Sequence, residues 1–138
     1  MRRLTTAQNV QLDGYLTKLS DFDITLSNLA YKFAQEEEPW SEILDVQGKV
    51  NNLLPEITEF CKDISQQMET YQKEKSDRWQ QSSLGLDYED WRRDWANAAV
   101  LINKLDLEEP GFRTTFSYFG IPAFEILTDL SSKRKLQV

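Results

Sequence analysis

Carboxylate side chains are the only groups in this chain numerous enough to assemble a reactive centre. The chain holds 23 Asp and Glu residues and no histidine, so it lacks the commonest general base and metal ligand. Glu36, Glu37 and Glu38 are consecutive, so on a helix they point in different directions and cannot converge on one ion. Asp21 and Asp23 diverge for the same reason. We therefore expect no catalytic residues, no metal site and no cofactor.

Other patterns that could support chemistry are also weak. The single cysteine, Cys61, lies between Phe60 and Ile64 on an apolar stripe, which predicts a buried, inert thiol. One cysteine forms no intramolecular disulfide and suits a reducing compartment, so we expect a cytoplasmic protein. The five glycines lie too far apart for a phosphate-binding loop. Together these patterns indicate that the protein is not an enzyme.

Tryptophan, tyrosine and arginine, the residue types enriched at binding hot spots, concentrate between Lys73 and Trp95. Trp91 and Trp95 are four residues apart on an apolar stripe, so we assign both to the core. Acidic residues in the same segment offset its positive charge. The residues expected to contact a partner are Trp40, Arg78, Trp79, Tyr88, Arg92 and Arg93, together with the acidic Glu36, Glu37 and Glu38.

The net charge of −7 disfavours nucleic acid as a partner, because phosphate binding requires a basic face. The basic residues gather at the two ends, about 1–4 and 132–138, where we expect short solvated tails. No stretch approaches the roughly 18 consecutive apolar residues that a membrane span needs, so we expect no membrane association.

Helices must position these side chains, because apolar residues recur every three or four positions. The first stripe runs from Leu12 to Phe33, with Thr5 or Thr6 as the helix cap and an end expected at Glu36–Glu38. The second runs from Ile43 to Tyr71, with Ser41 as the cap. Its members are Ile43, Val46, Val50, Leu53, Ile57, Phe60, Ile64, Met68 and Tyr71.

Pro55 lies inside the second stripe and removes a backbone hydrogen bond, which predicts a kink there. We expect this helix to continue to Gln81 and Gly85 to terminate it. A third helix, capped by Asp87, follows, and 106–111 form a loop. The core-facing residues of this third helix are Trp91, Trp95, Ala98, Ile102 and Leu105.

Aromatic residues Phe112, Phe116, Tyr118 and Phe119 come next, before a short helix from about Ala123 to Ser131. The sequence therefore predicts one all-α domain over residues 1–138, a bundle of four to five helices whose first two helices are long.

Long apolar stripes without reactive residues favour a non-catalytic protein-protein interaction module, which functions as an adaptor, regulator or assembly subunit. Another protein is the expected partner, and a homodimer is one form of this hypothesis. One alternative is an acidic inhibitor or nucleic-acid mimic that blocks a basic site on a nucleic-acid enzyme, for which a phage or mobile element is one origin considered. A second alternative is a weak nucleic-acid binder that uses the arginine and aromatic residues.

Overall fold

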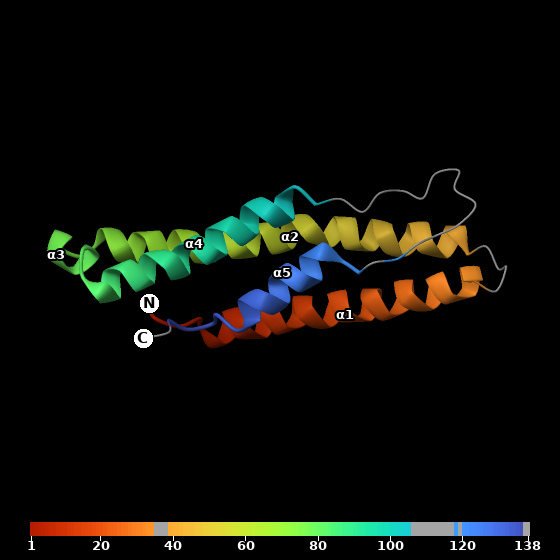
Figure 1. The fold of residues 1–138 in the computed structure, drawn as a ribbon, viewed down its shortest axis with the longest axis horizontal. Helices are drawn as coiled ribbons and strands as arrows, with labels where there is room; N and C mark the ends of the chain where they lie inside the picture. Colours follow the sequence, from red (N-terminus) through yellow and green to blue (C-terminus); the bar gives the residue numbers. More distant parts are fainter. Residues whose placement is uncertain (35–38, 106–117, 119, 137–138) are drawn as a thin grey trace.

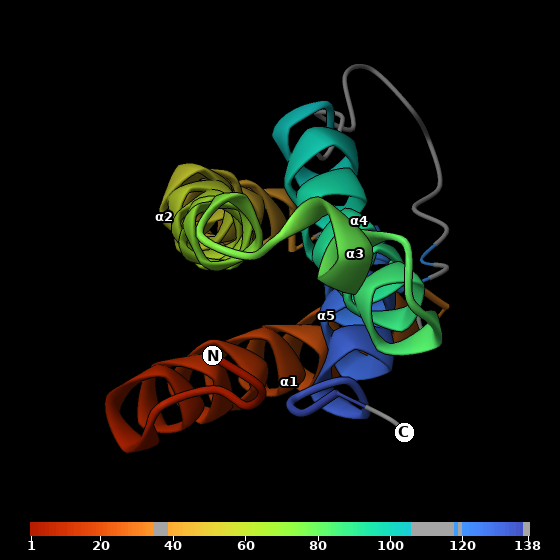
Figure 2. The same cartoon turned by 90° about the vertical axis from the view of Figure 1, so that its left-hand side faces the viewer.

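The computed structural model describes residues 1–34, 39–105, 118 and 120–136. Over these residues the chain forms five helices and no strand. Figure 1 shows α1, α2 and α4 along the long axis of the molecule, with the shorter α5 between α1 and α4. The end-on view in Figure 2 shows the same neighbours, with α3 at the near end. The predicted all-α bundle is therefore confirmed.

The first helix, α1 (Thr6–Ala34), begins at a reciprocal pair of hydrogen bonds between Thr5 and Gln8. The Gln8 amide donates to Thr5 Oγ1 at 3.1 Å, and the Thr5 amide donates to Gln8 Oε1 at 2.9 Å. This capping box satisfies two donors that a helix start leaves free, so the predicted cap at Thr5 is confirmed. The predicted end at 36–38 lies outside the described residues. The buried face consists of Leu12, Tyr15, Leu19, Leu26 and Leu29.

The second helix, α2 (Trp40–Lys73), runs through Pro55 without interruption, and Pro55 itself is exposed. The predicted kink at this proline remains a prediction. Ser41 is not the cap, because Pro39 occupies that position and makes no side-chain hydrogen bond. The predicted stripe is buried from Ile43 to Met68. Its face is wider than predicted because α2 packs against both α4 and α1. The additional buried residues are Gln47, Leu54, Thr58, Cys61 and Ser65.

The expected continuation of α2 to Gln81 and the expected stop at Gly85 are wrong. A four-residue helix, α3 (Asp77–Gln80), follows α2 and is capped by Ser76, whose Oγ accepts from the Trp79 amide at 3.2 Å. A similar bond from the Gly85 amide to Ser82 Oγ, at 3.1 Å, starts the next helix. Serine side chains compete for backbone donors in this way and end helices in polar segments. Ser82, rather than Asp87, is therefore the cap.

The long fourth helix, α4 (Ser83–Asn103), packs along α2 and buries its predicted core face from Trp91 to Ile102, with Leu105 half-buried just beyond its end. The fifth, α5 (Pro122–Ser131), starts with proline in its first turn, where the missing N–H costs nothing. It contacts both α1 and α4. The predicted loop at 106–111 and three of the aromatic residues lie outside the described residues: Phe112, Phe116 and Phe119.

The backbones of residues 2–4 and 134–136 pair with each other. The Leu4 amide donates to the Arg134 carbonyl and the Leu136 amide donates to the Arg2 carbonyl, both at 2.8 Å. Both leucines are buried. The expectation of solvated tails is therefore wrong for Leu4 and Leu136, whose side chains reach the core, whereas Arg2, Arg3 and Lys135 are exposed as predicted. None of the helices described here has an apolar stretch long enough to cross a bilayer.

Candidate functional site

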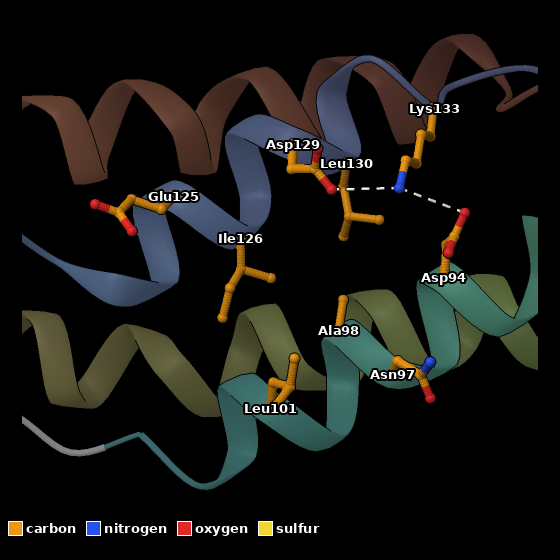
Figure 3. A pocket seen from close by; sticks show the side chains of 9 residues that line it. All are labelled: Asp94, Asn97, Ala98, Leu101, Glu125, Ile126, Asp129, Leu130 and Lys133. Atoms are coloured by element: carbon orange, nitrogen blue, oxygen red, sulfur yellow. Dashed lines mark ion pairs between the residues drawn. The ribbon is translucent and has the colours of Figure 1, made fainter.

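A groove of about 370 Å³ lies between α4 and α5, and we call it the α4–α5 groove (Figure 3). Both walls are helices, so side chains three or four positions apart recur along each wall. Its lining residues are Asp94, Asn97, Ala98 and Leu101 from α4, Glu125, Ile126, Asp129 and Leu130 from α5, and Lys133 just after α5.

The floor of this groove is apolar and graded in exposure. Among the residues that line it, Ala98 and Leu130 are buried and Ile126 is half-buried. Leu101 is 52% exposed at one wall. Figure 3 shows Leu101 and Ile126 on facing helices. A half-exposed leucine beside a buried apolar floor leaves apolar surface that a partner can cover.

The rim of the groove is acidic. Lys133 Nζ lies 3.5 Å from Asp94 Oδ2 and 3.3 Å from Asp129 Oδ2, so one ammonium links two carboxylates (Figure 3). Desolvation disfavours the charged lysine, but its bonds to Asp129 and Asp94 outweigh this and raise the Lys133 pKa above its usual value. Glu125 forms no ion pair with any described residue. Among the described residues of the rim, three carboxylates and one ammonium give a net negative charge.

Two tryptophans hold Lys133 at this rim. Trp91 Nε1 donates to the Lys133 carbonyl at 2.7 Å, and Trp95 Nε1 reaches the same oxygen at 3.3 Å. Both indoles are buried, which confirms their assignment to the core. The position of the ammonium therefore depends on the packing of α4 beneath the segment that follows α5.

Tyr88, which was predicted to contact a partner, is completely buried. Its ring stacks on Tyr71 at 5.0 Å between centroids and meets Trp79 and Trp91 edge-on at 5.8 and 5.5 Å. Burial, followed by the nearby Tyr71, raises the Tyr88 pKa. Tyr88 therefore has no surface to offer a partner, whereas Trp79 is half-buried at the edge of this cluster.

Arg92 and Arg93, which were predicted to contact a partner, both pair with Glu89 of their own helix. Arg92 Nε donates to Glu89 Oε2 at 3.0 Å, and Arg93 Nη2 lies 3.6 Å from Glu89 Oε1. The hydrogen bond from Arg92 lowers the pKa of Glu89 to about 2, against an opposing effect of desolvation. Arg92 is half-buried and Arg93 is exposed. Neither is a free cation.

The remaining predicted residues are far apart. Trp40, half-buried, begins α2, whereas Arg78 is exposed in α3 beyond the other end of α2. A helix of 34 residues is about 50 Å long, and Figure 1 shows the two ends on opposite sides of the molecule. Glu36, Glu37 and Glu38 lie outside the described residues. The predicted residues therefore do not form one surface.

The chemistry of Cys61 agrees with its prediction. Cys61 is buried, which confirms that part of the prediction, and burial raises the pKa of its thiol to about 12, which disfavours the reactive thiolate. Among the residues with described positions, no group of three or more Asp, Glu or Cys side chains is arranged to hold a metal ion.

The sequence could not identify the α4–α5 groove. The helical spacing of α5 indicates that it has an apolar face, but spacing says nothing about which helix this face meets. About twenty residues separate the two walls in the chain. No protein family, curated protein or solved structure compared with the chain matches it.

Proposed function

We propose that the protein is a non-catalytic interaction module that binds another protein through the α4–α5 groove. The observation that carries this proposal is the half-exposed Leu101 beside a floor of Ala98, Ile126 and Leu130. Interfaces between proteins combine an apolar centre with a polar rim, and the groove has both. Charged residues at the rim give such a contact its orientation.

Site-specific photo-crosslinking tests this function. A benzoylphenylalanine in place of Leu101 is expected to form a discrete protein adduct in cells of the natural host. The same substitution at Leu86 is the control, because Leu86 lies on the same helix, is 58% exposed and does not line the groove. Mass spectrometry then identifies the adduct.

An adduct at position 101 that is missing at position 86 supports the proposal. Equal labelling at both positions, or none at position 101, contradicts it. Both variants replace an exposed leucine on α4, so their effects on folding should be similar. Thermal unfolding of the two variants checks this.

We propose a homodimer as a separate form of interaction, through α1 rather than through the α4–α5 groove. Val10, Ile24 and Tyr31 are exposed on α1 at multiples of seven residues, which places them on one side of the helix. Light scattering at micromolar concentration distinguishes monomer from dimer, and a strict monomer removes this form.

The acidic inhibitor has less support. Two acidic residues that could contribute to its negative face have cations beside them: Glu42 lies 3.9 Å from Lys32, and Asp45 lies 3.1 Å from Lys49. This alternative and the nucleic-acid binder stay predictions. We also propose a cytoplasmic location, for which the single buried thiol of Cys61 is the support.

A further inference from the structure

We infer that the occupant of the α4–α5 groove is a cationic amphipathic helix of a partner protein. This inference rests on the proposed function, since it names the kind of partner that the same groove accepts. Two features of the groove carry it: the charge of the rim and the periodicity of the walls.

The rim selects for positive charge. Asp94 and Asp129 share one ammonium, from Lys133, and Glu125 forms no ion pair with any described residue. An occupant that brings lysine or arginine beside Glu125 gains an attractive contact, whereas an acidic occupant meets net repulsion. The same charge argues against a polyanion such as nucleic acid.

The walls select for a helix. On α4 the lining residues recur at 94, 97, 98 and 101, and on α5 at 125, 126, 129 and 130. These steps of three and four form ridges along two helices, and a third helix packs its own ridge into the furrow between such ridges. The span from Asp94 to Leu101 is about 10 Å, or two turns, which accommodates apolar residues at i, i+3 or i+4, and i+7.

A second copy of this chain does not fit as the occupant. Asp94, Glu125 and Asp129 line the groove itself, so two copies that met groove to groove would bring like charges together. The exposed apolar residues of α1 offer no cationic face either, since α1 carries three aspartates and two lysines. The chain as a whole carries a net charge of −7, which adds to that repulsion. The occupant is therefore a different protein.

A model peptide tests this inference on the full chain. The probe has about 16 residues, with leucine at i, i+4, i+7 and i+11 and lysine at most other positions, and fluorescence anisotropy follows its binding. The comparison peptide keeps the leucines and replaces every lysine with glutamate. We expect saturable one-to-one binding of the lysine peptide that weakens as salt rises, and no binding of the glutamate peptide.

Matched variants locate the binding. Leu101→Asn is expected to weaken binding about tenfold, because the leucine side chain loses apolar contact, whereas Leu86→Asn leaves it unchanged. Glu125→Gln is expected to weaken binding about two- to threefold at low salt and to leave it unchanged at high salt. Glu56→Gln, an exposed change on α2 outside the groove, is the control for total charge.

Equal binding of both peptides, or equal loss in Leu101→Asn and Leu86→Asn, overturns the inference. Failure of the lysine peptide to bind does so as well. If position 101 still crosslinks to a protein in cells and the lysine peptide does not compete, the partner class is wrong and the interaction function stands. If the peptide binds and position 101 crosslinks to no protein, the proposed interaction function is contradicted, although the groove does prefer a cationic amphipathic helix.

Discussion

Trp91 Nε1 donates a 2.7 Å hydrogen bond to the carbonyl of Lys133, a residue 42 positions later in the chain. This bond joins the core of α4 to the segment that carries Lys133, the one cation among the described residues that line the groove. The first consequence is for stability: Trp91→Phe removes the donor and part of the buried ring, which is expected to cost about 1–3 kcal/mol. Urea unfolding followed by circular dichroism measures this loss. Trp79→Phe, at a half-buried position, should cost less, and an equal cost would contradict the importance of the bond.

The second prediction concerns pH. The pKa of Glu89 is about 2 in the folded protein, first because Arg92 donates hydrogen bonds to it and then because Gln72 does. In the unfolded chain a glutamate titrates near about 4.3. The folded pKa is the lower one, so the contribution to stability is complete above about pH 4.3 and disappears as the pH falls toward 2.

Glu89→Gln should therefore flatten the pH dependence of the unfolding free energy between about pH 5 and 2, with a loss of about 1 kcal/mol or less at neutral pH because solvent screens the pair. Arg92→Gln should flatten the same part of the profile, and the double variant should add little. Independent, additive effects of the two substitutions would show that the pair is not coupled.

A third prediction compares two glycines. At Gly85 an added Cβ would lie 2.2 Å from the Trp79 carbonyl oxygen and 2.8 Å from Gln80 Cα, both of which are backbone atoms. Gly85→Ala must therefore displace α3 and is expected to cost about 1–3 kcal/mol. At Gly48 nothing lies within 4 Å, so Gly48→Ala should stabilise α2 by about 0.5–1 kcal/mol. Thermal melts of the two variants should shift in opposite directions, and shifts of the same sign would be inconsistent with this packing.

A fourth prediction concerns an unpaired buried hydroxyl. Thr58 is 8% exposed, and its Oγ1 has no hydrogen-bond partner within the described part of the chain. It lines a hollow of about 360 Å³ between α2 and α4. Thr58→Val keeps the shape and removes the unsatisfied group, which should stabilise the protein by about 1 kcal/mol.

Thr70→Val serves as the control, because Thr70 is exposed and donates to the Gln66 carbonyl at 3.1 Å. Its effect should remain within about 0.5 kcal/mol. Chemical denaturation measures the unfolding free energy of both variants. Destabilisation by Thr58→Val would mean that the hydroxyl has a partner, such as an ordered water.

Sequence spacing alone was enough to predict the helices and their inner faces. The predicted stripe from Ile43 to Met68 is buried, and so are Trp91, Trp95 and Cys61. The first stripe is buried from Leu12 to Leu29 except at Leu16 and Phe22, which are half-buried. These predictions succeed because helical periodicity is a local property: residues three or four apart share a face whatever lies opposite. The breaks near Ser76 and Ser82 were missed, because serine caps resemble ordinary polar residues on a helix surface.

Only the tertiary structure decided which faces meet. It buried Tyr88, separated Trp40 from Arg78, paired residues 2–4 with 134–136 and placed α5 beside α4. None of these contacts is encoded in spacing, because each joins segments distant in the chain and depends on the apolar area that the whole bundle buries at once. The α4–α5 groove arises from that packing, at the place where the side chains of two helices leave Leu101 partly uncovered.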